Sequence, residues 1–381
     1  MNTLHNPIKC IIPPHMLKAM LVNGNAAQKQ VALAAITGSA QFRGRRQAIS
    51  ESIAYLTTVP ANGKHRRVYD TKDNSTLPGS IVRDEGSDPV SDPAVNEAYD
   101  GAGATYDLYW DVYQRNSVDG HGLRLDSTVH YQQNYDNAFW NGQQMVYGDG
   151  DGQIFNRFTL AVDVIGHELT HGVTQYTSNL NYSNQSGALN ESFSDVFGSL
   201  VKQRQRGQSA ANADWLIGEG LFTSSVKGVA LRSMKAPGTA YDDPILGKDP
   251  QPAHMRDYLN TSDDNGGVHI NSGIPNHAFY LMATAIGGFA WEKTGNIWYV
   301  AARDKFTSNT DFQNAADLTF QTAGELYGQG SAEQKGVQYG WDGVGITIGA
   351  ASQPQPQPKA NNGCLNVPAA MIRLFSRNPK G

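Results

Sequence analysis

The sequence predicts an α+β fold with two lobes, a strand-rich lobe followed by a helical lobe. Between residues 68 and 147, Tyr, Val, Thr and Trp are frequent and Gly- or Pro-containing breaks separate short runs, which is typical of strands joined by turns. Between residues 159 and 345 the pattern favours helices. A chain of 381 residues is long enough for about two domains with their own cores.

The elements follow in order along the chain. An Ala-, Leu-, Lys- and Gln-rich stretch from Met16 to Ile36 predicts a helix. Strands are expected around 128–131 and 144–147, and helices at 159–177, 187–205, 271–287, 294–307 and 312–328. The Gln-Pro alternation from Gly349 to Gly363 predicts an extended linker or a disordered tail. We therefore expect a leader at 1–62, a β-rich lobe at 63–177, a helical lobe at 178–350 and a tail at 351–381.

The charge is distributed unevenly behind a net value of −5. Residues 1–64 carry seven Lys or Arg against the single acid Glu51, a net +6, and residues 351–381 carry +4, so the body between them carries −15. A basic leader beside an acidic body favours electrostatic docking, and the alternative is a basic tail that contacts nothing. An acidic body repels phosphates, which disfavours nucleic acid as a partner.

Membrane insertion and a disulfide framework are both disfavoured. No stretch approaches the ~18 apolar residues of a membrane helix, and Pro13-Pro14 interrupts the only candidate for a signal peptide. Cys10 and Cys364 lie at opposite ends of the chain, and we expect them not to pair.

Two segments carry the chemistry. His167 and His171 lie four residues apart in a predicted helix, so both imidazoles point the same way and can share one metal ion. Glu191 can supply the third ligand and leave a fourth position for water. Asp195 shares a helix face with Glu191 and can accept a hydrogen bond from a liganding histidine. The alternatives are a chance histidine pair and a solvated acidic face.

These residue types indicate hydrolysis of a peptide bond. A bound zinc ion would polarise the carbonyl and lower the pKa of water. Glu168 lies between the two histidines, where it can take the proton from that water and deliver it to the leaving amine. The tetrahedral intermediate carries a negative oxygen, so further hydrogen-bond donors are expected.

The chain resembles the thermolysin family of zinc endopeptidases from about residue 68 to residue 348. The resemblance rests on His167-Glu-Leu-Thr-His171, Gly187-Ala-Leu-Asn-Glu191-Ser-Phe-Ser-Asp195, Asn137-Ala-Phe-Trp-Asn-Gly142, Met145-Val-Tyr-Gly-Asp-Gly-Asp-Gly152, Leu231-Arg-Ser-Met234 and Asp264-Asn-Gly-Gly-Val-His-Ile-Asn-Ser-Gly273. It implies a two-lobed fold with the zinc helix at the junction, one catalytic zinc ion and protein or peptide substrates.

The resemblance also implies roles for more distant residues. His269 and Tyr182 would donate to the oxyanion, with Asp264 orienting His269 across a tight Asn-Gly-Gly loop. An edge strand would pair with the substrate backbone, a carbonyl of the substrate would be held, and an apolar pocket would favour Leu, Phe, Ile or Val after the cleaved bond. Asn137 and Ala138 would lie on the edge strand, and Arg232 would hold the carbonyl. The apolar pocket would be lined by Phe155, Phe158, Val164 and Leu231. The alternative for the last four is ordinary core.

The leader is similar to that of the protealysin-like branch of the family, through Ile12-Pro-Pro-His-Met-Leu17. This similarity implies an intramolecular inhibitor and a zymogen that removes its own leader. Cys10 could act as a thiolate that blocks the zinc ion, and the simpler alternative is a leader cysteine without that role. Family relatives imply secretion, and retention in the cytoplasm is the alternative because no signal peptide is visible.

The calcium sites of thermolysin are only partly kept. Asp163, Asp214 and Glu219 resemble acids of its paired calcium site, but Lys202 stands where that site has a bridging glutamate. A lysine ammonium would repel calcium and occupy its place, and Val229 replaces an acid of another site. We expect at most one calcium ion.

Two rival functions are weaker. A catalytically dead zinc-binding module or a protein inhibitor would predict loss of Glu168, Tyr182 or His269, and all three are present. An aminopeptidase or another zinc hydrolase with a similar helix would need a site for a free amino terminus, and no feature demands one. We therefore expect a monomeric zinc endopeptidase with its leader as an internal inhibitor, and neither nucleic acid nor membrane as a partner.

Overall fold

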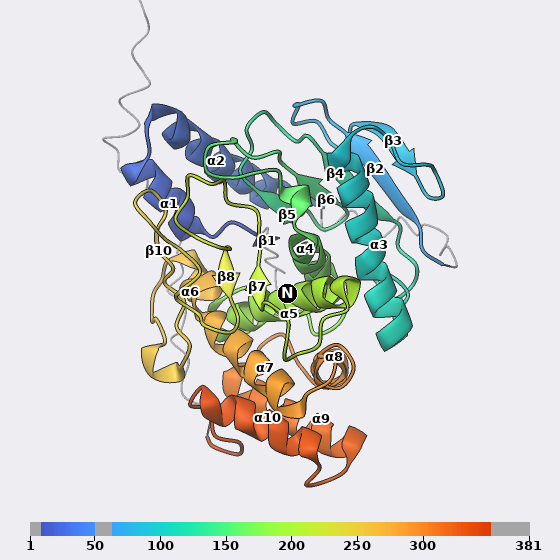
Figure 1. Cartoon of the computed structure of the whole chain (residues 1–381), viewed down its shortest axis with the longest axis vertical. Helices are drawn as coiled ribbons and strands as arrows, with labels where there is room; N and C mark the ends of the chain where they lie inside the picture. Colours follow the sequence, from blue (N-terminus) through green and yellow to red (C-terminus); the bar gives the residue numbers. More distant parts are fainter. Residues whose placement is uncertain (1–8, 50–62, 352–381) are drawn as a thin grey trace, which may run out of the picture.

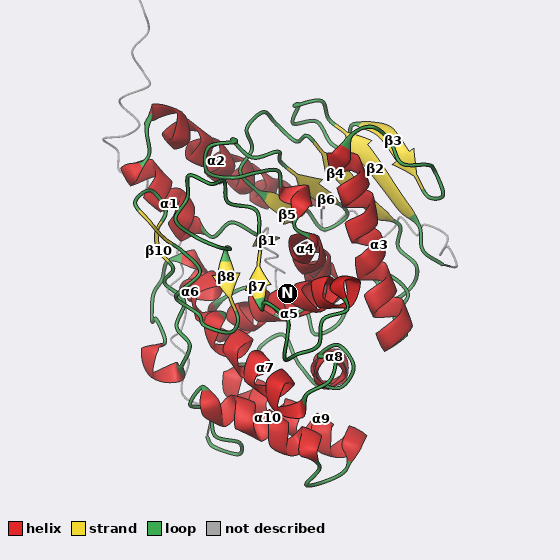
Figure 2. Cartoon of the chain, in the orientation of Figure 1, coloured by secondary structure: helices red, strands yellow, loops and turns green. Residues whose placement is uncertain are grey.

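The structure is a computed structural model that describes residues 9–49 and 63–351, with side chains for 10–37 and 63–351. It contains a β-rich lobe and a helical lobe with helix α4 between them (Figure 1). Figure 2 shows strands gathered in the first lobe and helices dominating the second. This arrangement confirms the predicted α+β fold. The Gln-Pro stretch beyond residue 351 and Cys364 lie outside the described residues.

A six-stranded sheet forms the first lobe. Its strand order is β1-β5-β6-β4-β2-β3, in which β4 runs parallel to β2 and β6 while the other pairs are antiparallel. The strands are β1 (Lys9–Cys10), β2 (Arg66–Asp70), β3 (Ser80–Asp84), β4 (Leu125–Val129), β5 (Ala138–Trp140) and β6 (Met145–Tyr147). The predicted strand at 144–147 is confirmed as β6. The one expected at 128–131 ends at Val129, because His130 adopts a left-handed φ of 53°.

One helix in this lobe was not predicted. Helix α3 (Pro93–Tyr113) lies inside the stretch that the sequence suggests is strand and turn. Its Tyr, Trp, Val and Gly content weakens helix propensity. Asp92 caps its first turn by accepting a hydrogen bond from the Ala94 N–H, and Pro93 stands at the first helical position. Packing of the helix on the sheet outweighs its propensity.

Helices build the second lobe as predicted. The five expected helices are confirmed as α4 (Val162–Gln175), α5 (Asn184–Arg206), α7 (Gly273–Ile286), α8 (Thr294–Asp304) and α9 (Phe312–Tyr327). The structure adds α6 (Asp264–Asn271) and α10 (Ala332–Gly343), the 3-10 turns η2 (Phe158–Leu160) and η3 (Met255–Asp257), and the strand pairs β7 (Leu216–Ile217) with β8 (Arg232–Ser233) and β9 (Asp242–Asp243) with β10 (Gly247–Lys248). Among the described residues, no helix combines the length and apolarity needed to cross a bilayer.

Two glycines set the contact between α4 and α5. A Cβ atom on Gly198 of α5 would lie 2.3 Å from the Asp163 carbonyl oxygen of α4. A Cβ atom on Gly166 of α4 would lie 3.0 Å from the Cα atom of Gly198. Only glycine allows this close approach of two backbones. It brings the His167 face of α4 against the Glu191 face of α5.

The leader forms two helices where the sequence suggests one. Helix α1 (Pro14–Asn23) ends at Gly24, and α2 (Ala26–Ile49) begins just after Asn25. Asn25 and Gln28 exchange hydrogen bonds, because each backbone N–H donates to the side-chain oxygen of the other residue, at 2.9 and 3.0 Å. This reciprocal cap starts a new helix and explains the break.

The leader packs on the two lobes. Met16, Leu17 and Met20 of α1 are buried and belong to the same apolar cluster as the lobes. Lys18 forms an ion pair with Asp263 at 3.0 Å. For the described part of the leader, the alternative of a basic tail without contacts is therefore wrong.

Candidate metal centre and active site

Three residues from two helices converge at the junction of the lobes. His167 and His171 project from α4 and Glu191 from α5, and all three side chains are buried. Their ligand atoms lie within 4.8 Å of one another. The His167 Nε2 atom lies 3.5 Å from Glu191 Oε2, and His171 Nε2 lies 3.4 Å from Glu191 Oε1.

This geometry fits a tetrahedral zinc ion. Two ligand atoms at ~2.05 Å from such an ion lie about 3.3 Å apart, close to both separations. His167 Nε2 and Glu191 Oε2 are buried without a hydrogen-bond partner, which costs free energy unless a cation takes their lone pairs. The donor set of two imidazoles and a carboxylate is one that zinc prefers.

The far side of each histidine ring is fixed by a polar partner. His167 Nδ1 lies 2.8 Å from Asp195 Oδ1, and His171 Nδ1 lies 2.9 Å from Asn190 Oδ1 and 2.8 Å from Ser194 Oγ. These contacts leave Nε2 of both rings facing the centre. Asn190 and Ser194 were not predicted, although they lie four residues apart on α5, the spacing that singled out Glu191 and Asp195.

Asp195 connects the metal centre to Arg232. The Arg232 Nε and Nη2 groups donate to the two carboxylate oxygens of Asp195 at 2.9 and 2.8 Å, and Asn276 Nδ2 donates at 2.8 Å. Burial alone would raise the pKa of Asp195, but Arg232 and His167 hold it below its usual value. The sequence assigned Asp195 and Arg232 separate tasks, and it gave no sign of Asn276.

Glu168 lies beside the strand that bounds the centre. Its buried Oε2 atom accepts a hydrogen bond from the Trp140 N–H of β5 at 3.0 Å. The side chain is therefore held between the zinc helix and β5.

Tyr182, His269 and Asp264 form one hydrogen-bonded chain. His269 Nδ1 lies 2.7 Å from Asp264 Oδ1, and the His269 N–H donates to Asp264 Oδ2 at 2.9 Å. The loop between them has φ of 51°, 91° and 74° at residues 265–267, so the tight Asn-Gly-Gly loop is confirmed although the segment begins a helix. Tyr182 Oη lies 3.1 Å from His269 Nε2 and donates to Glu191.

The protonation states of this chain suit hydrogen-bond donation. Burial alone would lower the pKa of His269, but the carboxylates of Asp264 and Glu191 raise it to about 9. Burial, followed by the Glu191 charge, raises the pKa of Tyr182 well above its ordinary value. Both side chains therefore hold a proton near neutral pH.

The leader occupies the strand expected to receive a substrate. β1 pairs antiparallel with β5, so β5 is an inner strand of the sheet here and the leader takes the edge. The Ile11 N–H donates to the Ala138 carbonyl oxygen at 3.2 Å, and the Ile12 N–H donates to Asn137 Oδ1 at 3.1 Å. Arg232 Nη1 donates to the Ile11 carbonyl oxygen at 3.2 Å.

The four residues expected to line an apolar pocket are all buried in the core. Phe155 and Phe158 lie with ring centroids 5.6 Å apart, and Val164 and Leu231 are equally inaccessible. Burial agrees both with a pocket wall and with ordinary core, so their role in specificity stays a prediction.

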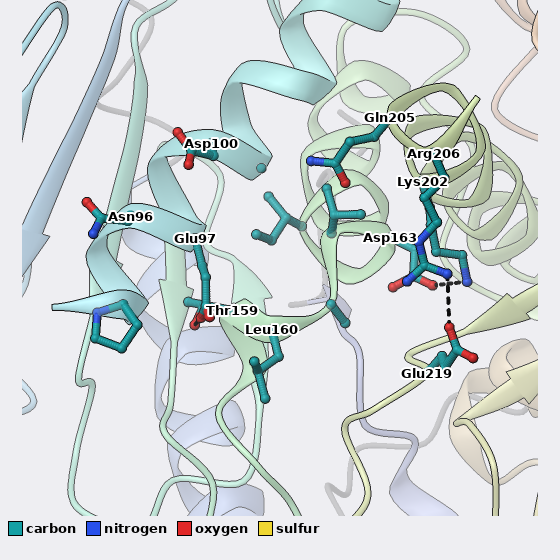
Figure 3. Close-up of a pocket in the computed structure, with 15 residues that line it drawn as sticks. Asn96, Glu97, Asp100, Thr159, Leu160, Asp163, Lys202, Gln205, Arg206 and Glu219 are labelled. Atoms are coloured by element: carbon teal, nitrogen blue, oxygen red, sulfur yellow. Dashed lines mark hydrogen bonds and ion pairs between the residues drawn. The ribbon is translucent and has the colours of Figure 1, made fainter. Parts of the chain in front are cut away.

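Cations already satisfy the acids expected at a calcium site. Lys202 Nζ lies 2.9 Å from Asp163 and 2.8 Å from Asp214, and Arg206 lies 3.1 Å from both Asp214 and Glu219. Figure 3 shows Lys202 directed at Asp163 and Arg206 directed at Glu219. These residues line a cavity of about 410 Å³ between α3, α4 and α5. The only group of three metal-ligating side chains among the described residues is the one at His167. The expectation of at most one bound calcium ion stays a prediction. These contacts disfavour calcium at the three acids, because lysine and arginine already neutralise them.

The fold and the centre define a zinc metallopeptidase of two lobes. Residues 45–175 match the model of the thermolysin metallopeptidase catalytic domain, and residues 178–346 match that of its alpha-helical domain. The chain belongs to the thermolysin family, in its protealysin-like branch.

Individual relatives agree with this assignment. An extracellular metalloprotease of Pectobacterium carotovorum subsp. carotovorum is 50% identical over 90% of this chain and 97% of its own. Protease PrtS of Photorhabdus sp. (strain Az29) is 46% identical over 91% and 95%. The solved precursor of protealysin from Serratia proteamaculans superposes with a TM-score of 0.81 at 50% identity, over 89% of this chain and all of that one.

Proposed function

We propose that this chain is the inhibited precursor of an endopeptidase that removes its own leader. The observation that carries the proposal is the environment of Ile11. Its N–H and C=O groups are taken by Ala138 and Arg232, and its side chain is fully buried. A peptide substrate that added a strand at β5 would need the same groups. Leader and substrate therefore exclude each other.

The hydrolytic roles follow from the positions of the side chains. A zinc ion held by His167, His171 and Glu191 would supply an activated water and polarise the substrate carbonyl. Glu168 takes a proton from the attacking water and passes it to the leaving nitrogen.

Two donors serve the oxygen that gains negative charge. His269 and Tyr182 each carry a proton and lie 3.1 Å apart, so both can donate to one oxygen atom. Asp264 keeps the imidazole of His269 in place through Nδ1, which leaves Nε2–H for the substrate.

A decisive experiment compares wild-type full-length protein with Glu168→Gln and a matched helix control, Thr174→Ser. We expect wild type and Thr174→Ser to lose the leader, which intact mass and cleavage of an end-blocked peptide would report. Glu168→Gln should keep the leader and bind one zinc ion per chain. If Glu168→Gln lost the leader at the wild-type rate, Glu168 would not be the catalytic base. The leader would then not be removed by the enzyme itself.

We also propose that the mature enzyme prefers a bulky apolar residue after the cleaved bond. The burial of Ile11 supports this preference. Leu has three more carbon atoms than Ala, and at ~0.8 kcal/mol each they favour Leu by roughly 60-fold in kcat/KM. End-blocked peptides that differ only at this residue measure the ratio, and a ratio near one would refute the apolar pocket.

Export is part of the proposal. The relative from Pectobacterium is named as extracellular, and the likeness over 90% of this chain supports the same location. Measuring the enzyme in the medium and in the cells of a producing culture tests it, with a cytoplasmic enzyme as the lysis control.

A further inference from the structure

One peptide bond of the leader is held from both sides by the body. The carbonyl oxygen of Cys10 lies 3.2 Å from His269 Nε2. On the other side of the same bond, the Ile11 N–H donates to Ala138 and the Ile11 carbonyl accepts from Arg232, each at 3.2 Å. The bond is therefore oriented at three points, which fixes the direction of the leader through the site.

The same bond lies at the catalytic groups. The His269 Nε2 atom that contacts the Cys10 carbonyl lies 3.1 Å from Tyr182 Oη and 3.6 Å from Glu191 Oε2. Lys9, one residue before Cys10, pairs in register with Trp140, whose N–H donates to Glu168. The carbonyl thus contacts the oxyanion donor His269, and the base is anchored to the strand that pairs with the leader.

The residue after the bond matches the specificity expected of the enzyme. Ile11 is apolar and branched, and none of its surface is exposed. Orientation, contacts and residue type therefore agree that the bond is presented as a substrate would be.

We infer that the Cys10–Ile11 peptide bond is a cleavage site of this enzyme, hydrolysed within its own molecule while the leader is still docked. The inference rests on the proposed self-processing activity. A water oxygen bonds to the Cys10 carbonyl carbon, the carbon–nitrogen bond to Ile11 breaks, and the nitrogen receives the proton that Glu168 took from that water. The products are a carboxylate on Cys10 and an amine on Ile11.

The cut should not by itself release activity. The new amine of Ile11 can still donate to Ala138, and the Ile12 N–H still donates to Asn137. The buried side chains of α1 lie beyond the cut and keep their contacts. The first product is therefore a nicked form in which residues from Ile11 onward still block the site.

In the test, zinc is added to zinc-free full-length protein to start the reaction. Intact mass and N-terminal analysis then follow the products. Wild type is run at two protein concentrations, beside Ile11→Leu, Ile11→Asp and Glu168→Gln. We expect a species beginning at Ile11, and free peptide 1–10, before the leader is lost. Their rate should not depend on protein concentration. Ile11→Leu should keep this cut, Ile11→Asp should slow it at least tenfold, and Glu168→Gln should abolish it.

The outcomes separate this inference from the proposed function. Loss of a leader that still contains an intact Cys10–Ile11 bond would overturn the inference and leave self-processing standing. A cut at this bond whose rate rises with protein concentration would overturn its intramolecular character. A chain that makes no cut after zinc is added would overturn both. Amide exchange at Ile12 shows whether Ile11→Asp still docks, so a missing cut is not mistaken for a lost leader.

Discussion

Acidification should release the leader, and His15 should set the pH at which this happens. His15 lies on α1, and its Nε2 atom is 2.8 Å from Tyr241 Oη of the body. Its Nδ1 atom is buried without a hydrogen-bond partner, so a proton added there would have no acceptor. Burial therefore lowers the pKa of His15 to about 4, with Asp264 opposing this effect. The value of about 4 also includes the effect of the positive charges of His269, Arg232 and Lys18, which lower the pKa of His15.

The size of the effect follows from linkage. An undocked leader should have an ordinary histidine pKa of ~6.5, above the docked value of about 4. Docking is then strongest above pH 6.5 and weakens as pH falls towards 4, because only the undocked state gains the proton. The equilibrium constant for opening of the leader should rise about 30-fold between pH 7.5 and pH 5. Its largest rise, reached once the pH lies below the docked pKa of His15, should be roughly 300-fold.

Hydrogen exchange by mass spectrometry measures this opening in the full-length Glu168→Gln protein, which we expect to keep its leader. The amides of Ile11 and Ile12 donate to the body, so their protection, corrected for intrinsic exchange, reports docking. His15→Gln should make the opening nearly independent of pH. Asn23→Ala is the matched control, because it removes a hydrogen bond to Ile245 without a titrating group.

The comparison isolates one side chain. Every other titrating group is present in both proteins, so its contribution cancels when the opening constant of the parent is divided by that of His15→Gln. Exchange in β2 reports global stability and should not follow the leader. If His15→Gln opened with the same pH dependence as the parent, or if the parent opened equally at both pH values, the reasoning from His15 would be refuted.

Three further predictions concern the body. Asp195→Asn should weaken zinc binding by about 10- to 100-fold in a chelator competition, because the charge that orients His167 is lost. His269→Ala should lower kcat about 100-fold, with a smaller change in KM, because one oxyanion donor is removed. Lys202→Glu should make the melting temperature rise with millimolar calcium, because it replaces the ammonium beside Asp163 with a ligand.

Each of these predictions has an outcome that would contradict it. Unchanged zinc affinity in Asp195→Asn would mean that the helices alone orient the ring. A change confined to KM in His269→Ala would make this residue a binding group. A calcium response in the wild type would show that Lys202 does not fill the site.

The metal centre could be predicted because its geometry is local. His167 and His171 share a helix face by spacing alone, and so do Glu191 and Asp195. The helix contact that joins the two pairs depends on Gly166 and Gly198, whose role is visible only when the backbones are placed. Side-chain spacing thus indicates what a helix presents, and packing decides what it meets.

The contacts that escaped prediction join residues distant in the chain. Arg232 holds Asp195 with two hydrogen bonds and Ile11 with a third, across 37 and 221 residues. Arg206 neutralises acids that resemble calcium ligands, and only Lys202 was suspected of this. No regular spacing of residues in the sequence indicates such pairs. Helix α3 was missed for the opposite reason, because its local propensity disagrees with the packing that stabilises it.

The contacts of the leader also indicate why cleavage and release are separate events. β1 contributes a few backbone hydrogen bonds, each worth about 0.5–1.5 kcal/mol net. Met16, Leu17 and Met20 are buried in the common core, and each contributes about 1.5–3 kcal/mol. Most of the docking free energy therefore lies in α1, beyond the Cys10–Ile11 bond. A cut there leaves the inhibitor in place, whereas protonation of His15 acts on the helix that holds it.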